Sequence, residues 1–425
     1  MTTDKLATLS ETTNSDMTRE ADRAGDESHW DGWLLGATLT LMAFGLVMQY
    51  SASAVTNADK LGSHWYAVSS QLPKVCLGLA AMVVVANLHY NWWRRGVYWL
   101  LGGTFGLLLV VFVPGVGLTL NGSRRWIDLG VFLFQPAELA KLTMVVVMAY
   151  SVAKKGEKMR ELVFGILPHV LLVVFMAGPL LMQPDLGTTA ILAVMMSVMV
   201  FVSGTKLRYL VGLGGIGVGL LAVAILQRPY RIERVTAFLN PWQHQQDAAY
   251  QITGSLVAIG SAGLTGRGLG EGEGKLGYVP ELWNDFIATL VAEELGLLGI
   301  AAVVSLFLVF LWRGYRIAQR VEDPFGTYLA FGITTLIGMQ ACANLFVVTG
   351  LAPTKGLTLP LMSQGGSSLL MTLVGVGILL NISKRPPDRW AQQRPERERR
   401  REQKRLEKKR QRREKRTGES DTWAG

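Results

Sequence analysis

The chain has 425 residues, of which 50% are hydrophobic and 17% are charged, and its formal net charge is +10. Soluble proteins carry about 25% charged residues, so this composition excludes an ordinary globular enzyme, a disordered chain and a general nucleic-acid binder. The charges are concentrated at the ends, because residues 1–30 have a net charge of −4 and residues 382–425 have +9. We therefore predict a membrane domain, 31–383, between a polar N-terminal arm, 1–30, and a basic tail, 384–425.

Ten segments are apolar and long enough to be membrane-spanning helices, which need about 20 mostly apolar residues each. The sequence therefore predicts an all-α polytopic membrane protein. A long extracytoplasmic loop, 227–285, separates helices 7 and 8. The predicted spans are 33–53, 73–90, 97–113, 134–152, 164–182, 187–204, 209–226, 287–312, 327–350 and 366–383.

The short loops indicate the orientation, because Lys and Arg accumulate on the cytoplasmic side of a membrane. With a cytoplasmic N-terminus, the inner short loops hold 11 cations and the outer short loops hold five. Ten spans then place both termini in the cytoplasm. From Arg394 to Arg416 the basic tail has no aromatic residues interleaved with its charges, so we expect it to contact anionic membrane lipids and not nucleic acid.

Arg124 and Arg125 follow the third span, directly after an Asn-Gly pair that is typical of a tight turn. Two guanidinium groups held beside Trp126 could bind an anionic headgroup or a phosphate. Anchoring at the membrane interface, where Trp is common, explains the same pattern. Both interpretations remain open at this point.

Glu138 and Lys141 lie within a predicted span, where charged side chains are costly and mark candidate functional sites. Three residues apart on a helix, they share a face and can neutralise each other. They either line a polar cavity or form a buried pair that only fixes helix packing. Asp185, which precedes the sixth span, is interpreted chiefly as a helix cap.

The long outer loop begins with Arg228, Arg231 and Arg234, whose spacing places them on one face of a helix. This cationic stripe suits a diphosphate-bearing lipid and ordinary lipid headgroups equally well. A glycine-rich stretch, 260–275, then ends at Lys275 and allows tight turns and close approach by a ligand. It matches neither a Walker loop nor a dinucleotide fingerprint.

Asp285 lies where the chain re-enters the membrane, four residues after Glu281. A carboxylate at such a border is partly desolvated, which suits a general base, although a helix cap would occupy the same place. Proline and glycine residues in 350–368, a segment that includes Ser367, break the helix at membrane depth and would line a polar cavity. The sequence shows no Ser/His/Asp arrangement for hydrolysis and no His/Cys cluster for zinc.

Over residues 31–383 these segments resemble the SEDS family of membrane glycosyltransferases (shape, elongation, division and sporulation). The Gly45–Met48 and Tyr50–Ser53 runs, the long arm and the basic tail make the chain most similar to its cell-division branch, FtsW, with the elongation branch, RodA, as the near alternative. The motifs that carry the resemblance are NGSRRWIDLG (121–130), QPAELAKL (135–142), QPDLGT (183–188), RIERVTAFLNPWQ (231–243), YQITGSLVAIGSAGLTGRGLG (250–270), YVPELWNDF (278–286), EELG (293–296) and GLAPTKGLTLPLMSQGGSS (350–368).

The resemblance implies polymerisation of lipid II into β-1,4 glycan strands, with release of undecaprenyl diphosphate, at the septum on the outer face of a bacterial cytoplasmic membrane. It places the catalytic aspartate at Asp285. We assign substrate-binding roles to Arg124, Arg125, Glu138, Lys141, Arg231, Arg234, Lys275, Glu281 and Ser367.

The chemistry agrees with this assignment. The donor sugar is α-linked to a diphosphate and the product is β-linked, so one in-line displacement with inversion is required. Asp285 would accept the proton of the acceptor 4-hydroxyl, while Arg124, Arg125 and Lys141 would stabilise the departing diphosphate. A divalent cation, Mg²⁺ or Mn²⁺, could share that load, although the sequence shows no clean metal site.

The implied partners are a class B penicillin-binding transpeptidase resembling FtsI and the FtsQ–FtsL–FtsB complex. The chain departs from the family pattern where Trp283-Asn284 replace the usual His-Thr, and also at Ala262 and Gln364. Two rival functions are a transporter that flips lipid II and a scaffold that recruits the division machinery without chemistry.

Overall fold

The structure is a computed structural model that describes residues 30–61, 65–120, 122–130, 132–227, 229–247, 249–276, 279, 282–354 and 356–384. The chain divides into two units, and residues 29–319 with 324–384 form the larger one, to which the description below applies. The predicted arm, 1–30, and tail, 384–425, lie almost entirely outside the described residues, so their boundaries stay predictions.

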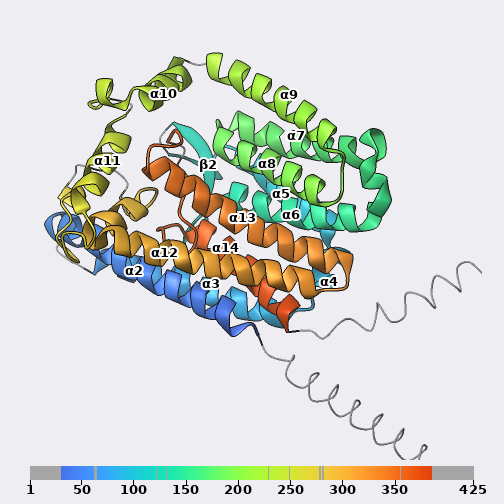
Figure 1. Cartoon of the computed structure of the whole chain (residues 1–425), viewed down its shortest axis with the longest axis horizontal. Helices are drawn as coiled ribbons and strands as arrows, with labels where there is room; N and C mark the ends of the chain where they lie inside the picture. Colours follow the sequence, from blue (N-terminus) through green and yellow to red (C-terminus); the bar gives the residue numbers. More distant parts are fainter. Residues whose placement is uncertain are drawn as a thin grey trace, which may run out of the picture. The chain divides into compact units, whose positions relative to one another are not determined.

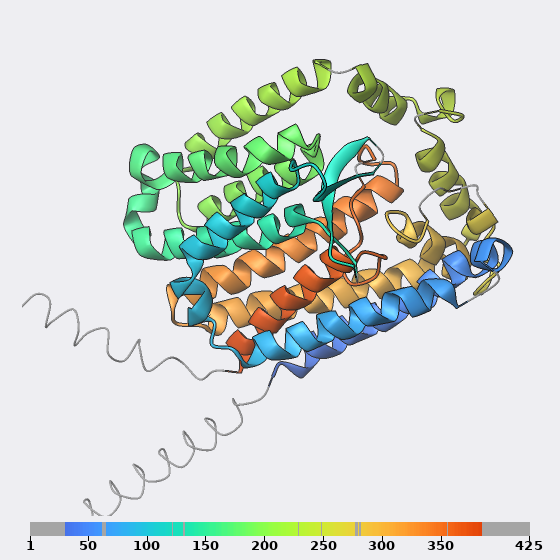
Figure 2. The ribbon, with the colours of Figure 1, turned by 180° about the vertical axis from the view of Figure 1, so that it is seen from behind.

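Each of the ten predicted spans contains a helix, and the helices lie side by side (Figures 1 and 2). Eight are long and apolar enough to cross a membrane, whereas α5 and α8 are apolar but shorter. The chain is therefore a multi-pass membrane protein. The ten helices are α2 (Gly32–Leu61), α3 (Tyr66–Asn87), α5 (Val97–Val110), α6 (Pro136–Lys155), α7 (Leu167–Met182), α8 (Leu186–Val202), α9 (Leu207–Leu226), α12 (Ile287–Arg320), α13 (Pro324–Val348) and α14 (Gly366–Ser383).

The centre of the bundle is built on α6, α13 and α14. α13 packs along α6, and α14 packs along α3 over most of its length. Gly78 and Gly377 permit this close approach, because a Cβ on Gly78 would lie 2.6 Å from Leu373 Cδ1 and one on Gly377 would lie 2.6 Å from the Met82 carbonyl oxygen. Small residues at such contacts are typical of helix packing in membranes.

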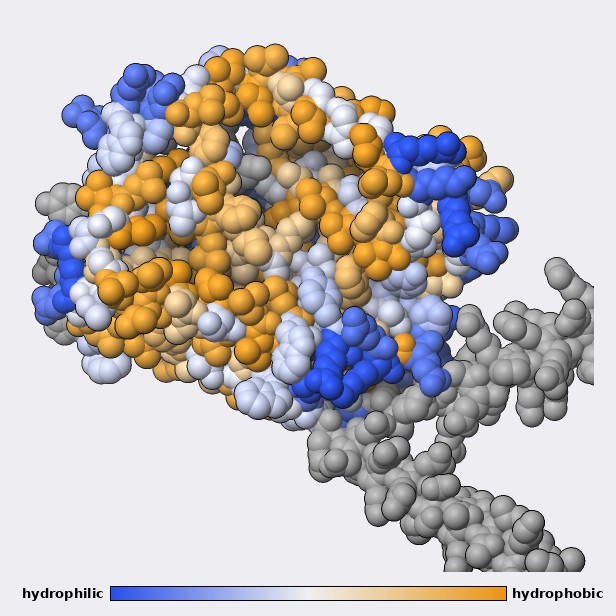
Figure 3. Space-filling model, in the orientation of Figure 1, coloured by the Kyte–Doolittle hydropathy of each residue, from blue (hydrophilic) through white to orange (hydrophobic). Residues whose placement is uncertain are grey.

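The outer surface of the helices is apolar. Figure 3 shows hydrophobic side chains over the helices and hydrophilic ones gathered towards their ends. α9 is an extreme case, since none of its residues is buried along its fully described length. A helix that is apolar all round and buried nowhere suits a lipid environment.

A small antiparallel sheet departs from the predicted all-α fold. Its strands, in the order β1-β2-β3, are β1 (Gly117–Leu120), β2 (Ser123–Asp128) and β3 (Leu133–Phe134). The turn between β1 and β2 contains Gly122 at φ +75°, which confirms the predicted tight turn. Residues 227–285 were predicted only as a loop, but they include α10 (Pro229–Leu239), α11 (Tyr250–Ala262) and short 3-10 turns at Pro241–Gln243 and Gly274–Leu276.

Several predicted boundaries shift, among them the end of α12, which lies at Arg320 and not at residue 312. α2 extends to Leu61, eight residues beyond the predicted end, and α3 begins at Tyr66 with Pro73 inside it. α7 is preceded by a π-helical turn, Leu162–Ile166, and the loop before that holds a 3-10 turn, Gly156–Arg160. A short helix, α4 (Asn91–Arg95), joins α3 to α5.

Candidate active site

Asp285 lies in the turn directly before α12, and neighbouring elements bond the backbone of this turn at Asp285 and at Trp283. Asn344 Nδ2 on α13 donates to the Asp285 carbonyl oxygen at 2.7 Å and to the Leu357 carbonyl oxygen at 2.6 Å. The Gln364 amide donates to the Trp283 carbonyl oxygen at 3.1 Å. The turn that carries Asp285 is therefore fixed between α13 and the residues that lead into α14.

The Asp285 carboxylate lies over a glycine of the broken segment 350–365. Gly356 has φ +65°, and a Cβ built on it would lie 3.3 Å from Asp285 Oδ2. The side chain of Asp285 is half-buried. The sequence predicted that this segment lines a polar cavity and, separately, that Asp285 lies at the membrane border; the structure places Gly356 beside the Asp285 carboxylate.

Glu138 and Lys141 form an ion pair in the first turns of α6. Lys141 Nζ lies 2.8 Å from Glu138 Oε1, and the two side chains are only 13% and 4% exposed for Glu138 and Lys141 respectively. The pair borders a small cavity between α6, α13 and α14. The cavity is lined by Glu138, Lys141, Leu142, Ile333, Leu336, Ile337, Gln340, Met371, Thr372 and Gly375. The structure therefore shows the buried pair, and the cavity beside it is lined mainly by apolar side chains and is not the polar cavity of the other interpretation.

Arg124 and Arg125 are neighbours on β2 and project to opposite faces, as successive strand residues do. Arg125 is half-buried and donates to the carbonyl oxygens of Gln183 at 2.8 Å and Pro184 at 2.7 Å. Arg124 is exposed and makes longer contacts, 3.1 Å to Thr119 Oγ1 and 3.4 Å to the Phe112 carbonyl oxygen. The two guanidinium groups therefore do not form one joint anion site.

Arg231 and Arg234 lie one turn apart on α10, so the predicted helix is confirmed, while Arg228 lies outside the described residues. Arg231 Nη1 donates to the Ala224 carbonyl oxygen at 2.6 Å, at the end of α9. Arg234 Nη1 donates to the Thr354 carbonyl oxygen at 3.3 Å. α10 is thereby connected both to α9 and to the segment that faces Asp285.

Four further predicted residues have different outcomes. Ser367, in the first turn of α14, is buried and connects that helix to β3 and to the start of α6. It donates to the Leu133 carbonyl oxygen at 2.8 Å and accepts from the Gln135 amide at 2.9 Å. Lys275 is largely buried beside Glu294. Glu281 lies outside the described residues. Asp185 caps α8 by accepting from the Thr188 amide at 3.0 Å, as predicted.

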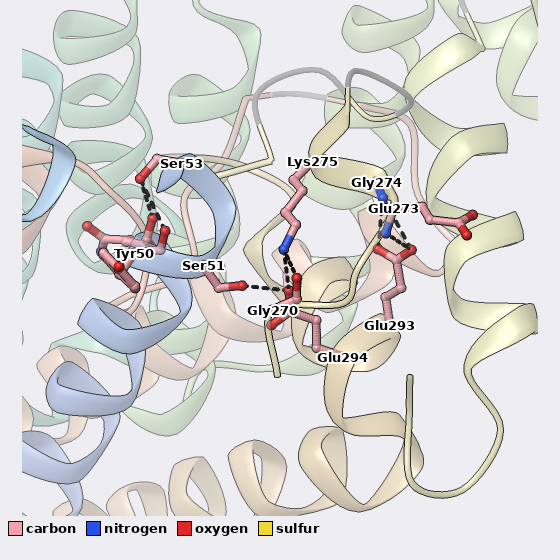
Figure 4. A network of polar contacts seen from close by, with 10 residues as sticks. Tyr50, Ser51, Ser53, Gly270, Glu273, Gly274, Lys275, Glu293 and Glu294 are labelled. Carbon is pink, nitrogen blue, oxygen red and sulfur yellow. Dashed lines mark hydrogen bonds and ion pairs between the residues drawn. The ribbon is translucent and has the colours of Figure 1, made fainter. Parts of the chain in front are cut away.

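Two buried carboxylates, Glu293 and Glu294 on α12, form a cluster that the sequence analysis quoted only as part of a motif. We name this pair the carboxylate clamp. Figure 4 shows the pair between α2 and the glycine-rich stretch, with Ser51, Glu273, Gly274 and Lys275 around it. Two adjacent acidic residues inside an apolar run could have identified this cluster from the sequence, since burying charge in a membrane protein is costly.

A family model described as a cell cycle protein, covering FtsW, RodA and SpoVE, matches residues 32–386. The chain belongs to the FtsW/RodA/SpoVE family. The resemblance to SEDS glycosyltransferases is thereby confirmed, and it extends over the whole of the helical bundle.

Curated relatives in this family match most of the chain. A probable peptidoglycan glycosyltransferase FtsW of Geobacter sp. (strain M18) is 42% identical over 356 residues, which cover 84% of this chain and 97% of that protein. Stage V sporulation protein E of Bacillus subtilis (strain 168) is 42% identical over 348 residues, covering 82% and 95%.

Solved structures of family members share the fold. A chain of a peptidoglycan synthase complex that coordinates polymerization and crosslinking is 29% identical, with a TM-score of 0.68, and the match covers 83% of this chain and 97% of that chain. The rod shape determining protein RodA of Thermus thermophilus is 29% identical, with a TM-score of 0.62 and coverage of 83% and 96%.

Proposed function

We propose that this chain is a peptidoglycan glycosyltransferase that polymerises lipid II into β-1,4 glycan strands during septal wall synthesis. The family and its FtsW-named relatives support the reaction class. The observation that carries the assignment of the base is the position of Asp285, whose carboxylate lies against Gly356 in the broken segment before α14. Asn344 bonds the Asp285 carbonyl oxygen and the Gln364 amide bonds the Trp283 carbonyl oxygen, so the fold fixes the turn that carries this side chain.

In the proposed reaction, Asp285 accepts the proton of the acceptor 4-hydroxyl as that oxygen attacks C1 of the donor sugar. The C1–oxygen bond to the diphosphate breaks as the new glycosidic bond forms, so the α-linked donor gives a β-linked product and undecaprenyl diphosphate leaves. A base of this kind must lie within hydrogen-bonding distance of the hydroxyl that it deprotonates. Fixing its backbone through Asn344 limits the geometries that it samples.

The departing diphosphate needs positive charge nearby. Arg124 is exposed on β2, whereas Arg125 already donates to two carbonyl oxygens and Lys141 is paired with Glu138. We therefore assign the first contact with the diphosphate to Arg124, and place Glu138 and Lys141 in the wall of the central cavity. Arg231, Arg234, Lys275, Glu281 and Ser367 remain proposed binding residues.

We propose in addition that a divalent cation, Mg²⁺ or Mn²⁺, neutralises part of the negative charge on the diphosphate. Within the described ranges there is no group of three or more His, Cys, Asp or Glu side chains that could hold a metal ion. The described residues therefore do not form a metal site by themselves, and no step of the proposed reaction depends on the cation.

The proposed setting is the septum of a bacterial inner membrane, with both termini in the cytoplasm. One structural relative is a chain of a peptidoglycan synthase complex that coordinates polymerization and crosslinking. We propose by analogy that this chain works with a class B penicillin-binding transpeptidase resembling FtsI, and with the FtsQ–FtsL–FtsB complex. The apolar surface of α9 and the neighbouring helices would contact membrane lipids and the lipid tail of the substrate.

The test uses purified full-length protein, with and without the transpeptidase partner, and fluorescently labelled lipid II. Wild-type protein should give ladders of glycan strands, and Asp285→Asn should give none while keeping the melting temperature of the wild type. Arg124→Ala should slow polymer formation. Wild-type protein that yields no polymer with its partner, yet moves lipid II across liposomes, would instead identify a transporter. A scaffold would support division in cells with Asp285→Asn.

A further inference from the structure

The first half of the carboxylate clamp holds backbone amides. Glu293 is 2% exposed, and its Oε1 accepts from the Glu273 amide at 2.8 Å and from the Gly274 amide at 3.2 Å. Its Oε2 also lies 3.2 Å from the Gly274 amide. A buried carboxylate is stable only if hydrogen bonds replace its lost hydration. Here those bonds come from the end of the glycine-rich stretch, so Glu293 fixes that end to α12.

The second half of the clamp joins three elements. Glu294 is fully buried, and its Oε1 accepts from Ser51 Oγ of α2 at 2.5 Å and lies 3.6 Å from Lys275 Nζ. Lys275 also donates to the Gly270 carbonyl oxygen, and its side chain is only 7% exposed. Figure 4 shows α2, the stretch and α12 meeting at this carboxylate.

The backbones of the stretch and α12 also cross in direct contact. The Arg267 amide donates to the Glu293 carbonyl oxygen at 3.0 Å, and the Gly268 amide donates to the Glu294 carbonyl oxygen at 2.9 Å. Gly266 and Gly296 leave room for this crossing, because a Cβ on Gly296 would lie 2.4 Å from the Gly266 nitrogen. Gly296 has φ +65° and interrupts the helical geometry of α12 at this point.

The held end of the stretch packs against the turn that carries Asp285. The Val279 amide donates to the Gly274 carbonyl oxygen at 3.2 Å, and a Cβ on Gly274 would lie 3.7 Å from Leu282 Cδ1. Leu282 is 1% exposed and precedes Asp285 by three residues. Gly274 therefore lies close to Leu282, three residues before Asp285, and this is the route by which the held end of the stretch could influence the turn.

We propose that Glu293 and Glu294 are positioning residues for Asp285: they hold the glycine-rich stretch on α12 and α2, and this contact sets the geometry of the proposed base. The inference rests on the proposed function, because it concerns the same carboxylate. It assigns no contact with substrate to either glutamate. Lys275, assigned above to substrate binding, acquires a second role as the counter-ion of Glu294.

The experiment compares Glu293→Gln and Glu294→Gln with Glu273→Gln in the full-length protein. Glu273 is a matched control, because its side chain is 62% exposed and pairs with Arg267 on the surface, where ion pairs contribute little. Ser51→Ala is a milder variant that removes one hydrogen bond to Glu294 and serves if a glutamine variant fails to fold. Melting temperature, amide hydrogen exchange of peptides from 263–286, and polymerisation kinetics are measured for each.

We expect Glu293→Gln and Glu294→Gln to exchange amides in 273–286 at least about tenfold faster than the wild type. Their kcat should fall by about ten- to a hundredfold, because small displacements of a catalytic group carry penalties of that order, while KM for lipid II stays within about twofold. Glu273→Gln should match the wild type. Since Glu294 and Lys275 act as a pair, Lys275→Met combined with Glu294→Gln should lose no more activity than the worse single variant.

Unchanged amide exchange in both glutamine variants would overturn the proposal that Glu293 and Glu294 hold the glycine-rich stretch. Faster exchange with unchanged kcat would show that the clamp is structural only, and a rise in KM alone would show contact with substrate instead; both results overturn the positioning role. If the wild-type protein makes no polymer, the proposed function fails, and the exchange measurement still decides whether Glu293 and Glu294 hold the stretch that precedes Asp285.

Discussion

Asn344 on α13 holds Asp285 by its backbone carbonyl oxygen at 2.7 Å, so a fully buried amide fixes the turn that carries the proposed base. The same amide nitrogen bonds the carbonyl oxygen of Leu357, which is next to Gly356. One side chain thus joins the two segments that meet at the candidate active site, and a loss at Asn344 should affect both.

Replacing Asn344 should therefore lower stability and activity together. Asn344→Leu leaves two carbonyl oxygens without their donor, and each unsatisfied buried group costs about 1–3 kcal/mol. We expect a lower melting temperature and slower glycan polymerisation. Asn87→Leu is the control, because Asn87 is exposed and bonds only the Val83 carbonyl oxygen of its own helix. Equal losses in the two variants would contradict the role of Asn344.

Gly356→Ala should reduce activity more than its backbone strain explains. A non-glycine residue at φ +65° costs about 1–2 kcal/mol. The new methyl group would in addition lie 3.3 Å from Asp285 Oδ2 and displace the carboxylate. Gly204→Ala is matched for strain at φ +86° but has nothing within 4 Å of its Cβ. Both variants should melt earlier than the wild type, and only Gly356→Ala should lose most of its polymerisation rate.

Substitutions of the two arginines of β2 should have different effects, one on stability and the other on activity. Arg125→Ala removes two hydrogen bonds to the Gln183–Pro184 turn and should lower the free energy of unfolding by about 1–3 kcal/mol. Arg124→Ala should keep the melting temperature and lower the polymerisation rate. Melting curves and lipid II assays of the same preparations check both. A stable, fully active Arg124→Ala protein would contradict its assignment to the diphosphate.

Removing one charge of the Glu138–Lys141 pair should destabilise the protein more than removing both charges. Lys141→Met leaves a buried carboxylate without its partner, which costs about 3–5 kcal/mol. Glu138→Gln combined with Lys141→Met removes both charges and should recover much of the lost stability. Thermal unfolding in detergent measures this. A double variant no more stable than Lys141→Met would argue against a simple pair, and its activity reports whether the charges themselves are needed.

Most of the helical bundle could be predicted from the sequence, because a membrane span needs a long apolar run that composition alone reveals. The errors lie at helix boundaries. Proline is common at the start of a helix and the span was predicted to begin at residue 73, but α3 begins at Tyr66 and continues through Pro73. The β1–β2 hairpin was missed, apart from its turn, because its strands are short and lie beside residues first considered for their charge.

The candidate site was predicted less completely. The spacing of Glu138 and Lys141 fixed their pairing, since both lie on one helix. Arg124 and Arg125 looked like a joint site because the prediction did not include a strand, which turns neighbouring side chains apart. The contact between Lys275 and Glu294 depends on the path of the chain through several glycines with positive φ, and no local pattern in the sequence encodes that path.

The crossing of Gly266 over Gly296 has a consequence for how the outer loop responds to heat. Where two main chains touch without intervening side chains, their spacing depends on van der Waals contact and on the backbone hydrogen bonds across the junction, and not on rotamers. Thermal hopping of side chains therefore cannot widen that junction gradually. It stays closed or it separates, so warming should detach the loop in a single step.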